Sequence, residues 1–86
     1  MRARSGNRAV ANRQIARAHE LLGLRKELPT ARRAMEIAQA RSLDQQSLEI
    51  LREMQRNGTL IPAYAGDLKD LPEFIARCER ELASLR

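Results

Sequence analysis

The most regular feature of the sequence is an apolar stripe near its C-terminal end. Apolar side chains recur there at helical spacing: Leu71, Phe74, Ile75, Cys78, Leu82 and Leu85. Steps of three and four residues place them on one face of an α-helix over residues 71–85. Asp70 and Glu73 form a capping box, Pro72 suits the first helical turn, and Arg77 is spaced to pair with Glu73 or Glu81. Such a face must be covered by other helices, so the sequence predicts an all-α fold.

Residues 7–22 form the first predicted helix, with Asn7 as its N-cap. Its apolar positions are Ala11, Ile15, Ala18 and Leu22, and Gly23 then suits the C′ position. Residues 1–6 precede this pattern and carry two arginines, so we predict a flexible basic arm there.

Residues 31–57 hold two apolar stripes. The stripe of 31–38 and that of 43–54 point in nearly opposite directions on one continuous helix. A break near Ser42, which forms a capping box with Gln45, lets both stripes face one core. We therefore predict two helices, 31–41 after a Thr30 cap and 43–56 ending at Asn57-Gly58. The alternative is one long helix with two separate partners.

The predicted fold is a small all-α bundle of four short helices in a single domain, residues 7–86, behind the basic arm. Its core is thin, because 13 residues are alanine and only 2% are aromatic. So small a core gives a chain of 86 residues only a few kcal/mol of stability. We therefore expect a homodimer whose interface is formed by the last helix, through Phe74, Ile75, Leu82 and Leu85.

The net charge of +5 is unevenly distributed. Residues 1–33 hold nine basic and two acidic side chains, whereas residues 34–86 hold seven basic and nine acidic ones. A segregated basic segment is typical of proteins that bind phosphates or an acidic protein surface. The alternative is a solvated basic surface that aids solubility.

Residues 37–51 partly resemble a helix-turn-helix. The matching positions are Ile37-Ala38, Leu43, Ser47-Leu48 and Leu51, whereas Ser42 and Arg41 depart from the motif. If the motif forms, its second helix presents Gln and Arg side chains to base edges in the major groove. The alternative is a plain helical corner. The predicted nucleic-acid-binding residues are Arg2, Arg4, Arg8, Arg13, Arg17, Arg32, Arg33, Gln45, Gln46 and Arg52.

No constellation of residues predicts an enzyme, a metal site or a cofactor. The single histidine, His19, lacks ligating neighbours at metal-site spacing, so we expect a solvated surface residue. The single cysteine, Cys78, lies within an apolar stripe, where we expect a buried small hydrophobe.

The longest uncharged run is ten residues, 57–66, well short of the roughly 18 apolar residues of a membrane helix. We therefore expect a cytoplasmic protein with no membrane contact. The leading functional prediction is a small non-enzymatic nucleic-acid-binding or regulatory accessory protein, acting on duplex DNA. The alternative is a protein–protein adaptor or inhibitor that docks amphipathic helices on a partner.

Overall fold

The computed structural model describes residues 2–86, with side chains from residue 6 onward. It contains three α-helices: α1 (Arg2–Gly23), α2 (Thr30–Arg56) and α3 (Ala65–Ser84). A short 3-10 turn, η1 (Pro62–Tyr64), leads into α3. Residues 2–86 contain no strand, which confirms the all-α prediction.

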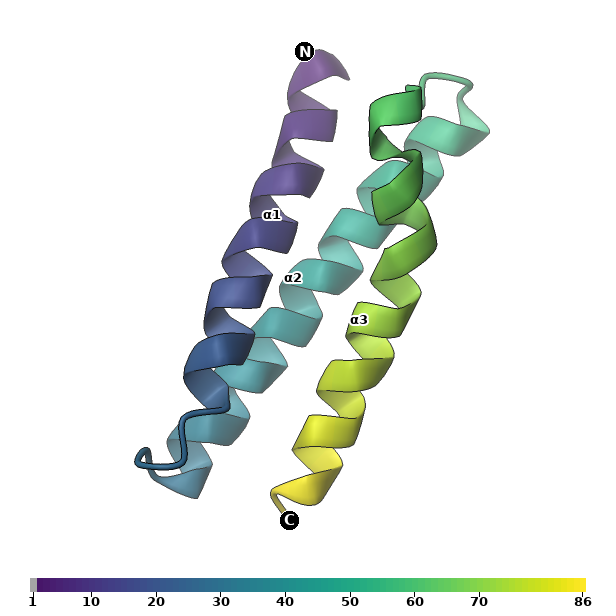
Figure 1. Ribbon diagram of the computed structural model, residues 1–86. Coiled ribbons are helices and arrows are strands. Elements are labelled where there is room, and N and C mark those ends of the chain that lie inside the picture. The colour runs from purple at the N-terminus through teal and green to yellow at the C-terminus, as the bar shows by residue number, and fades with distance from the viewer. Residues whose placement is uncertain (1) are drawn as a thin grey trace.

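The helices form an elongated antiparallel bundle of 43 × 20 × 15 Å (Figure 1). Helix α2 runs opposite to its two neighbours, and both α1 and α3 pack against it. The backbones of α1 and α3 stay farther apart, and long charged side chains bridge the space between them. None of the helices in residues 2–86 is long and apolar enough to cross a membrane.

The prediction of four helices is wrong, because residues 30–56 form one unbroken helix. Its buried residues are Ile37, Ala40, Asp44, Ser47, Leu48 and Leu51, which continue through the expected break near Ser42. No turn is needed because most of the 31–38 stripe is not buried: Met35 is 69% exposed, and Ala34 and Ala38 are only half-buried. One buried run from Ile37 to Leu51 contacts both α1 and α3. The alternative reading of one long helix is the one that the structure adopts.

Helix α1 packs through a different face from the predicted one. Ile15 is 48% exposed, whereas Ala9, Ala16, Glu20 and Gly23 are buried. The small residues Ala9, Ala16 and Gly23 allow close packing on α2: a Cβ at Gly23 would lie 2.5 Å from Cγ1 of Ile37. Gly23 therefore allows α1 and α2 to approach closely, and it does not adopt the left-handed conformation of a helix cap. Arg33 Nε donates a 2.8 Å hydrogen bond to its carbonyl. Helix α1 also starts at Arg2, so the backbone of the predicted arm is helical from residue 2 and Asn7 is not its N-cap.

The end of α2 was predicted correctly. Gly58 has φ +70°, and the amides of Gly58 and Thr59 donate to the carbonyls of Gln55 and Met54, as in a Schellman motif. Helix α3 begins earlier than predicted, at Ala65, with Pro72 in its interior. The apolar face extends backwards through Leu68 and Tyr64, and packing of these side chains outweighs the single hydrogen bond that Pro72 cannot donate.

Two apolar clusters form the core. One contains Ala9, Leu48, Leu51 and Leu71, and the other contains Ala16, Ile37, Ala40 and Cys78. Asp44 lies between Ala40 and Leu48 along α2, so a polar layer divides the two clusters. This layer contains most of the charged contacts between α1 and α3.

Candidate functional site

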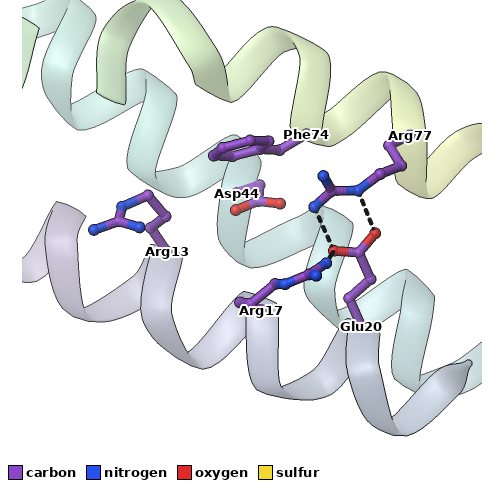
Figure 2. A pocket seen from close by; sticks show the side chains of 6 residues that line it. All are labelled: Arg13, Arg17, Glu20, Asp44, Phe74 and Arg77. Atoms are coloured by element: carbon purple, nitrogen blue, oxygen red, sulfur yellow. Dashed lines mark hydrogen bonds and ion pairs between the residues drawn. The ribbon is translucent and has the colours of Figure 1, made fainter. Parts of the chain in front are cut away.

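The central feature of the polar layer is a buried carboxylate shared by two arginines. Glu20 is 1% exposed, and Arg77 of α3 binds it through two hydrogen bonds of 2.7 and 2.6 Å. Arg17, one turn earlier on α1, donates a third hydrogen bond of 2.9 Å to Glu20 Oε1 (Figure 2). One negative charge therefore lies between two positive ones.

Burial by itself would raise the pKa of Glu20. Hydrogen bonds from Arg77 and Arg17 outweigh that effect, so the pKa of Glu20 lies well below its usual range. Arg77 also stacks on the Phe74 ring, with its guanidinium carbon 5.0 Å from the ring centroid. Glu20 is thus an ionised, fixed group that orients Arg77.

Asp44 is the second buried acid in this layer. The residue is 4% exposed, and its carboxylate has no hydrogen bond to the side chains described from residue 6 onward. Burial raises the pKa of Asp44 to about 6, and the charge of Glu20 adds to the increase, whereas Arg77 and Arg13 oppose it. A buried carboxylate without a donor is costly, and protonation or a bound partner would relieve the cost.

These groups surround a pocket of about 280 Å³ between α1 and α3. Its lining consists of Arg13, Arg17, Glu20, Asp44, Phe74 and Arg77. In Figure 2, Asp44 comes from α2 behind the gap, Arg13 and Arg17 line it from α1, and Phe74 and Arg77 line it from α3. Arg13 also forms a 3.0 Å ion pair with Asp67 of α3, which ties the two helices together beside the pocket.

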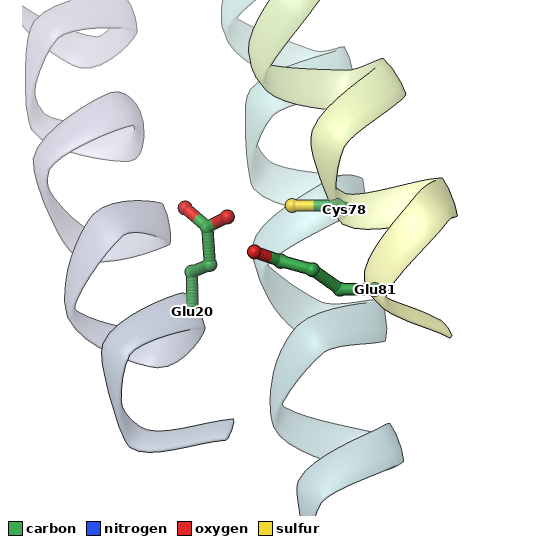
Figure 3. Close-up of side chains that lie close together, drawn as sticks. All are labelled: Glu20, Cys78 and Glu81. Atoms are coloured by element: carbon green, nitrogen blue, oxygen red, sulfur yellow. The ribbon is translucent and has the colours of Figure 1, made fainter. Parts of the chain in front are cut away.

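A second group of titratable side chains lies next to Glu20. A carboxylate oxygen of Glu20, Sγ of Cys78 and a carboxylate oxygen of Glu81 lie within 4.8 Å of one another (Figure 3). Burial, together with the neighbouring Glu20, raises the pKa of Glu81. Its buried Oε1 accepts no hydrogen bond from residues 6–86, and a protonated Glu81 would instead donate one toward Glu20.

This second group is poorly suited to a metal ion. Both oxygens of Glu20 already accept hydrogen bonds from arginine, and the Arg77 guanidinium would repel a cation there. Burial raises the pKa of Cys78 to about 12, so the thiol stays protonated and is a weak ligand. We therefore assign no metal site to Glu20, Cys78 and Glu81.

The predicted nucleic-acid-binding residues do not share one surface. Arg13, Arg17 and Arg32 form ion pairs with Asp67, Glu20 and Glu36, and Arg33 caps α1. Gln46 donates to Ser42, 3.4 Å away, and the side chains of Arg2 and Arg4 lie outside the described part. The three that remain exposed, with no ion pair or side-chain hydrogen bond in residues 6–86, are Arg8, Gln45 and Arg52.

The helix-turn-helix prediction is wrong. Residues 37–51 lie inside α2, with no turn at Ser42 and no separate second helix that could enter a groove. The spacing resembled a helix-turn-helix because apolar residues on the buried side of one long helix also recur every three or four positions.

His19 also differs from the expectation of a solvated residue. Its Nδ1 lies 2.6 Å from Oε1 of Glu36, in a hydrogen-bond contact between α1 and α2. The hydrogen bonds from His19 and Arg32 lower the pKa of Glu36.

The predicted dimer residues are divided between the two ends of α3. Phe74 and Ile75 pack on the cluster around Leu71, and Leu82 and Leu85 pack on the cluster around Ile37. Leu82 and Leu85 also line an open groove of about 410 Å³ between α2 and α3, together with Ala34, Met35, Ala38, Arg41 and Arg86. Met35 is 69% exposed on this groove.

Glu20, Asp44 and Arg77 were not predicted to form a site. Asp44 occurs in a run of buried positions at 37, 40, 44, 47 and 51, whose alternating steps of three and four are visible once one long helix is assumed. A polar residue within such a run is the signal that could have identified the site. Glu20 and Arg77 are 57 positions apart, and no local spacing connects them.

Comparison with known proteins gives no match: no family model, no curated protein and no solved structure is significantly similar to this chain. The function is therefore argued from the residues and their geometry.

Proposed function

We propose that the chain is a small non-enzymatic nucleic-acid-binding accessory protein that contacts the phosphates of duplex DNA with one basic end of the bundle. The observation that carries this proposal is the antiparallel register of α1 and α2. Ser47 donates a 2.7 Å hydrogen bond to the carbonyl of Ala9, so residues 2–8 run alongside the part of α2 that follows Ser47.

This register brings arginines from distant parts of the sequence to the same end. Arg8 is exposed on α1, and Arg52 and Arg56 are exposed on α2. None of the three forms an ion pair within residues 6–86. The backbone of Arg2 and Arg4 belongs to the first turn of α1 at this end. Unpaired arginines are available to neutralise phosphates and to release counterions.

A hollow of about 350 Å³ lies on the same stretch of α2. Its lining includes Gln45, Arg52 and Arg56, which can donate hydrogen bonds to phosphate oxygens. Glu49 also lines it and reduces the local positive charge. Binding through phosphates without a recognition helix would be weak and largely independent of sequence.

The test is a salt-dependent titration of the protein with random duplex DNA. The double variant Arg52→Gln, Arg56→Gln should weaken binding and lower the slope of log affinity against log salt by about 2, since two phosphate contacts are lost. The double variant Arg25→Gln, Arg80→Gln is the control matched for charge, because Arg25 and Arg80 lie outside the basic end in exposed ion pairs with Glu27 and Glu73.

Two outcomes would contradict the proposal. One is the absence of DNA binding by the wild-type protein at low salt. The other is an equal loss of affinity in the Arg25→Gln, Arg80→Gln control, which would indicate a diffuse effect of net charge. Parallel titration with RNA distinguishes the class of nucleic acid.

A second candidate function is docking of a partner protein on the groove between α2 and α3. The apolar part of this groove is uncovered in the monomer, and Arg41 and Arg86 also line it without ion pairs in the described residues. A groove between two helices fits a third helix. We propose an amphipathic helix with acidic residues beside its apolar face, because those residues would pair with Arg41 and Arg86.

Charge favours this partner over a second copy of the chain. A two-fold interface through the groove would gather Arg41 and Arg86 of both copies around a small contact. The predicted homodimer therefore remains an outcome to be measured by light scattering. If the wild type is a dimer that Met35→Asp dissociates, the groove belongs to self-association.

Selection from a displayed library of helical peptides tests the second candidate. Peptides enriched on the wild type should be acidic and amphipathic, and Met35→Asp should abolish their binding. Gln39→Asp is the control, because Gln39 is exposed on the same helix outside the groove lining. Enriched peptides without acidic residues, or peptides indifferent to Met35→Asp, would refute docking at this groove.

Cys78 is a free thiol, which fits the reducing cytoplasm where we expect either function.

A further inference from the structure

We propose that the pocket between α1 and α3 binds a small zwitterion, a molecule with an ammonium group for Asp44 and an anionic group for Arg17. The proposal is independent of DNA binding and of the α2–α3 groove. It rests on two groups of opposite charge that line the same pocket and have hydrogen-bonding capacity that the described residues do not use.

Asp44 is the unsatisfied acceptor. It is more than nine-tenths buried, it lines the pocket, and it accepts no hydrogen bond from the side chains described from residue 6 onward. Its neighbour Ser47 donates to the carbonyl of Ala9 at 2.7 Å and is unavailable. A ligand that donates to Asp44 would take the place of pocket water at this carboxylate.

Arg17 is the available donor. Among the side chains of residues 6–86, only Glu20 accepts from it, through Oε1 at 2.9 Å from Nη1, and that oxygen also accepts a 2.6 Å hydrogen bond from Arg77. Two positive charges thus share one carboxylate. The side chain of Arg17 is 51% exposed, so its remaining N–H groups can reach an anion in the pocket.

The charges of the pocket favour a zwitterion over a simple ion. Arg13 is neutralised by Asp67, which leaves one excess positive charge at Arg17, Glu20 and Arg77 and one negative charge at Asp44. A lone cation would pair with Asp44 but face three arginines, and a lone anion would pair with Arg17 but face two acids. A molecule with both charges pairs its ammonium group with Asp44 and its anionic group with Arg17, so both charges of the pocket are neutralised. The Phe74 ring offers an apolar surface for the carbon chain between them.

Binding should depend on pH through Asp44. The pKa of this acid, raised to about 6, means that Asp44 is ionised and able to pair with ammonium above that pH. The charged and titratable groups that influence it are Glu20 and Arg13 from α1 and Arg77 from α3. Cys78 of α3 remains a neutral thiol in this range, because its pKa is raised to about 12. Affinity should therefore fall as the pH drops through about 6.

The test is an NMR titration of the full chain with glycine, β-alanine and γ-aminobutyrate. At least one should give saturable shifts at the amide of Asp44 and the ring protons of Phe74. Acetate and methylammonium carry the two charges separately, and each should bind at least about tenfold more weakly, because each forms only one of the two contacts. The series identifies the charge separation that the pocket accepts.

Asp44→Asn and Arg17→Gln should each weaken binding about tenfold. Arg80→Gln should not, because Arg80 pairs with Glu73 outside the pocket lining. Thermal unfolding of each variant verifies that the fold is retained. The proposal is overturned if the zwitterions give no saturable shifts, if acetate or methylammonium binds as tightly, or if a folded Asp44→Asn protein binds with unchanged affinity.

Discussion

Arg77 of α3 binds Glu20 of α1 with two hydrogen bonds of 2.7 and 2.6 Å, although the residues lie 57 positions apart. This pair joins the two helices whose backbones do not pack directly against each other. Together with the Arg13–Asp67 pair, it fixes the spacing between α1 and α3, and hence the width of the pocket.

Replacing one member of this pair should destabilise the fold. Arg77→Met leaves the buried Glu20 carboxylate with only Arg17, and we expect a loss of about 3 kcal/mol in the free energy of unfolding. Urea denaturation measures it. The double variant Glu20→Met, Arg77→Met should be more stable than Arg77→Met alone, because no uncompensated charge is then buried. A double variant that is no more stable than Arg77→Met would refute this account.

The parts of the fold that were predictable from sequence are those marked by large side chains and turn residues. The stripe from Leu71 to Leu85 identifies α3, and Asn57-Gly58 marks the end of α2. The face of α1 was mispredicted because Ala9, Ala16 and Gly23 contribute little hydropathy, whereas Ile15 contributes much. Close approach of the α1 and α2 backbones outweighed burial of larger side chains.

The candidate site was not predictable for a different reason. Arg13 and Arg17 were singled out, but for phosphates, because a sequence shows charge and not the distant partner that neutralises it. Arg77 was expected to pair with Glu73 or Glu81, yet it binds Glu20, and Glu73 pairs with Arg80. Local spacing identifies the ion pairs that are possible within one helix, but the register between helices determines which of them form.

Gly23 should not tolerate even a methyl group. Its Cβ would lie 2.5 Å from Ile37 Cγ1 and 2.9 Å from the Arg33 carbonyl oxygen, so the helices would have to separate. We expect Gly23→Ala to cost about 1 to 3 kcal/mol, measured by thermal or urea unfolding.

Gly66→Ala is the matched control for Gly23→Ala. A Cβ at Gly66 meets nothing within 4 Å, and the residue lies in the first turn of α3. This change should be neutral or stabilise the helix by up to about 1 kcal/mol. Equal effects of the two substitutions would show that the close contact of Gly23 with α2 does not limit packing.

Cys78 should be chemically silent in the folded protein. Its side chain is fully buried, and burial raises the pKa of the thiol to about 12, so little thiolate forms near neutral pH. A thiol reagent should label it only as fast as the protein unfolds, and Cys78→Ala should cost about 1 kcal/mol. Rapid labelling of the native protein would contradict this prediction.

Stability should rise as the pH falls from neutral toward about 5. The pKa of Asp44 is raised from 3.8 to about 6, so the folded protein binds a proton that the unfolded chain releases. The penalty for the ionised, buried group is present in full above about pH 6 and is relieved progressively as the pH falls from 6 to the unfolded pKa of 3.8. A shift of this size corresponds to about 3 kcal/mol. Below about pH 4 the trend should reverse, because the pKa of Glu20 is lowered and the ion pairs that it forms are lost on protonation.

Asp44→Asn distinguishes the rise in stability below neutral pH from the loss of stability below about pH 4. Asparagine has nearly the same shape but carries no charge, so the variant should exceed the wild type in stability at pH 8, by less at pH 5, and match it only near pH 4, close to the unfolded pKa of Asp44. Its acid limb should be unchanged, because Glu20 retains both arginines. Urea midpoints measured across this range for both proteins provide the comparison. If the variant lost stability equally at every pH, the Asp44 carboxylate would be satisfied in the folded protein, and the charge imbalance attributed to the pocket would not exist.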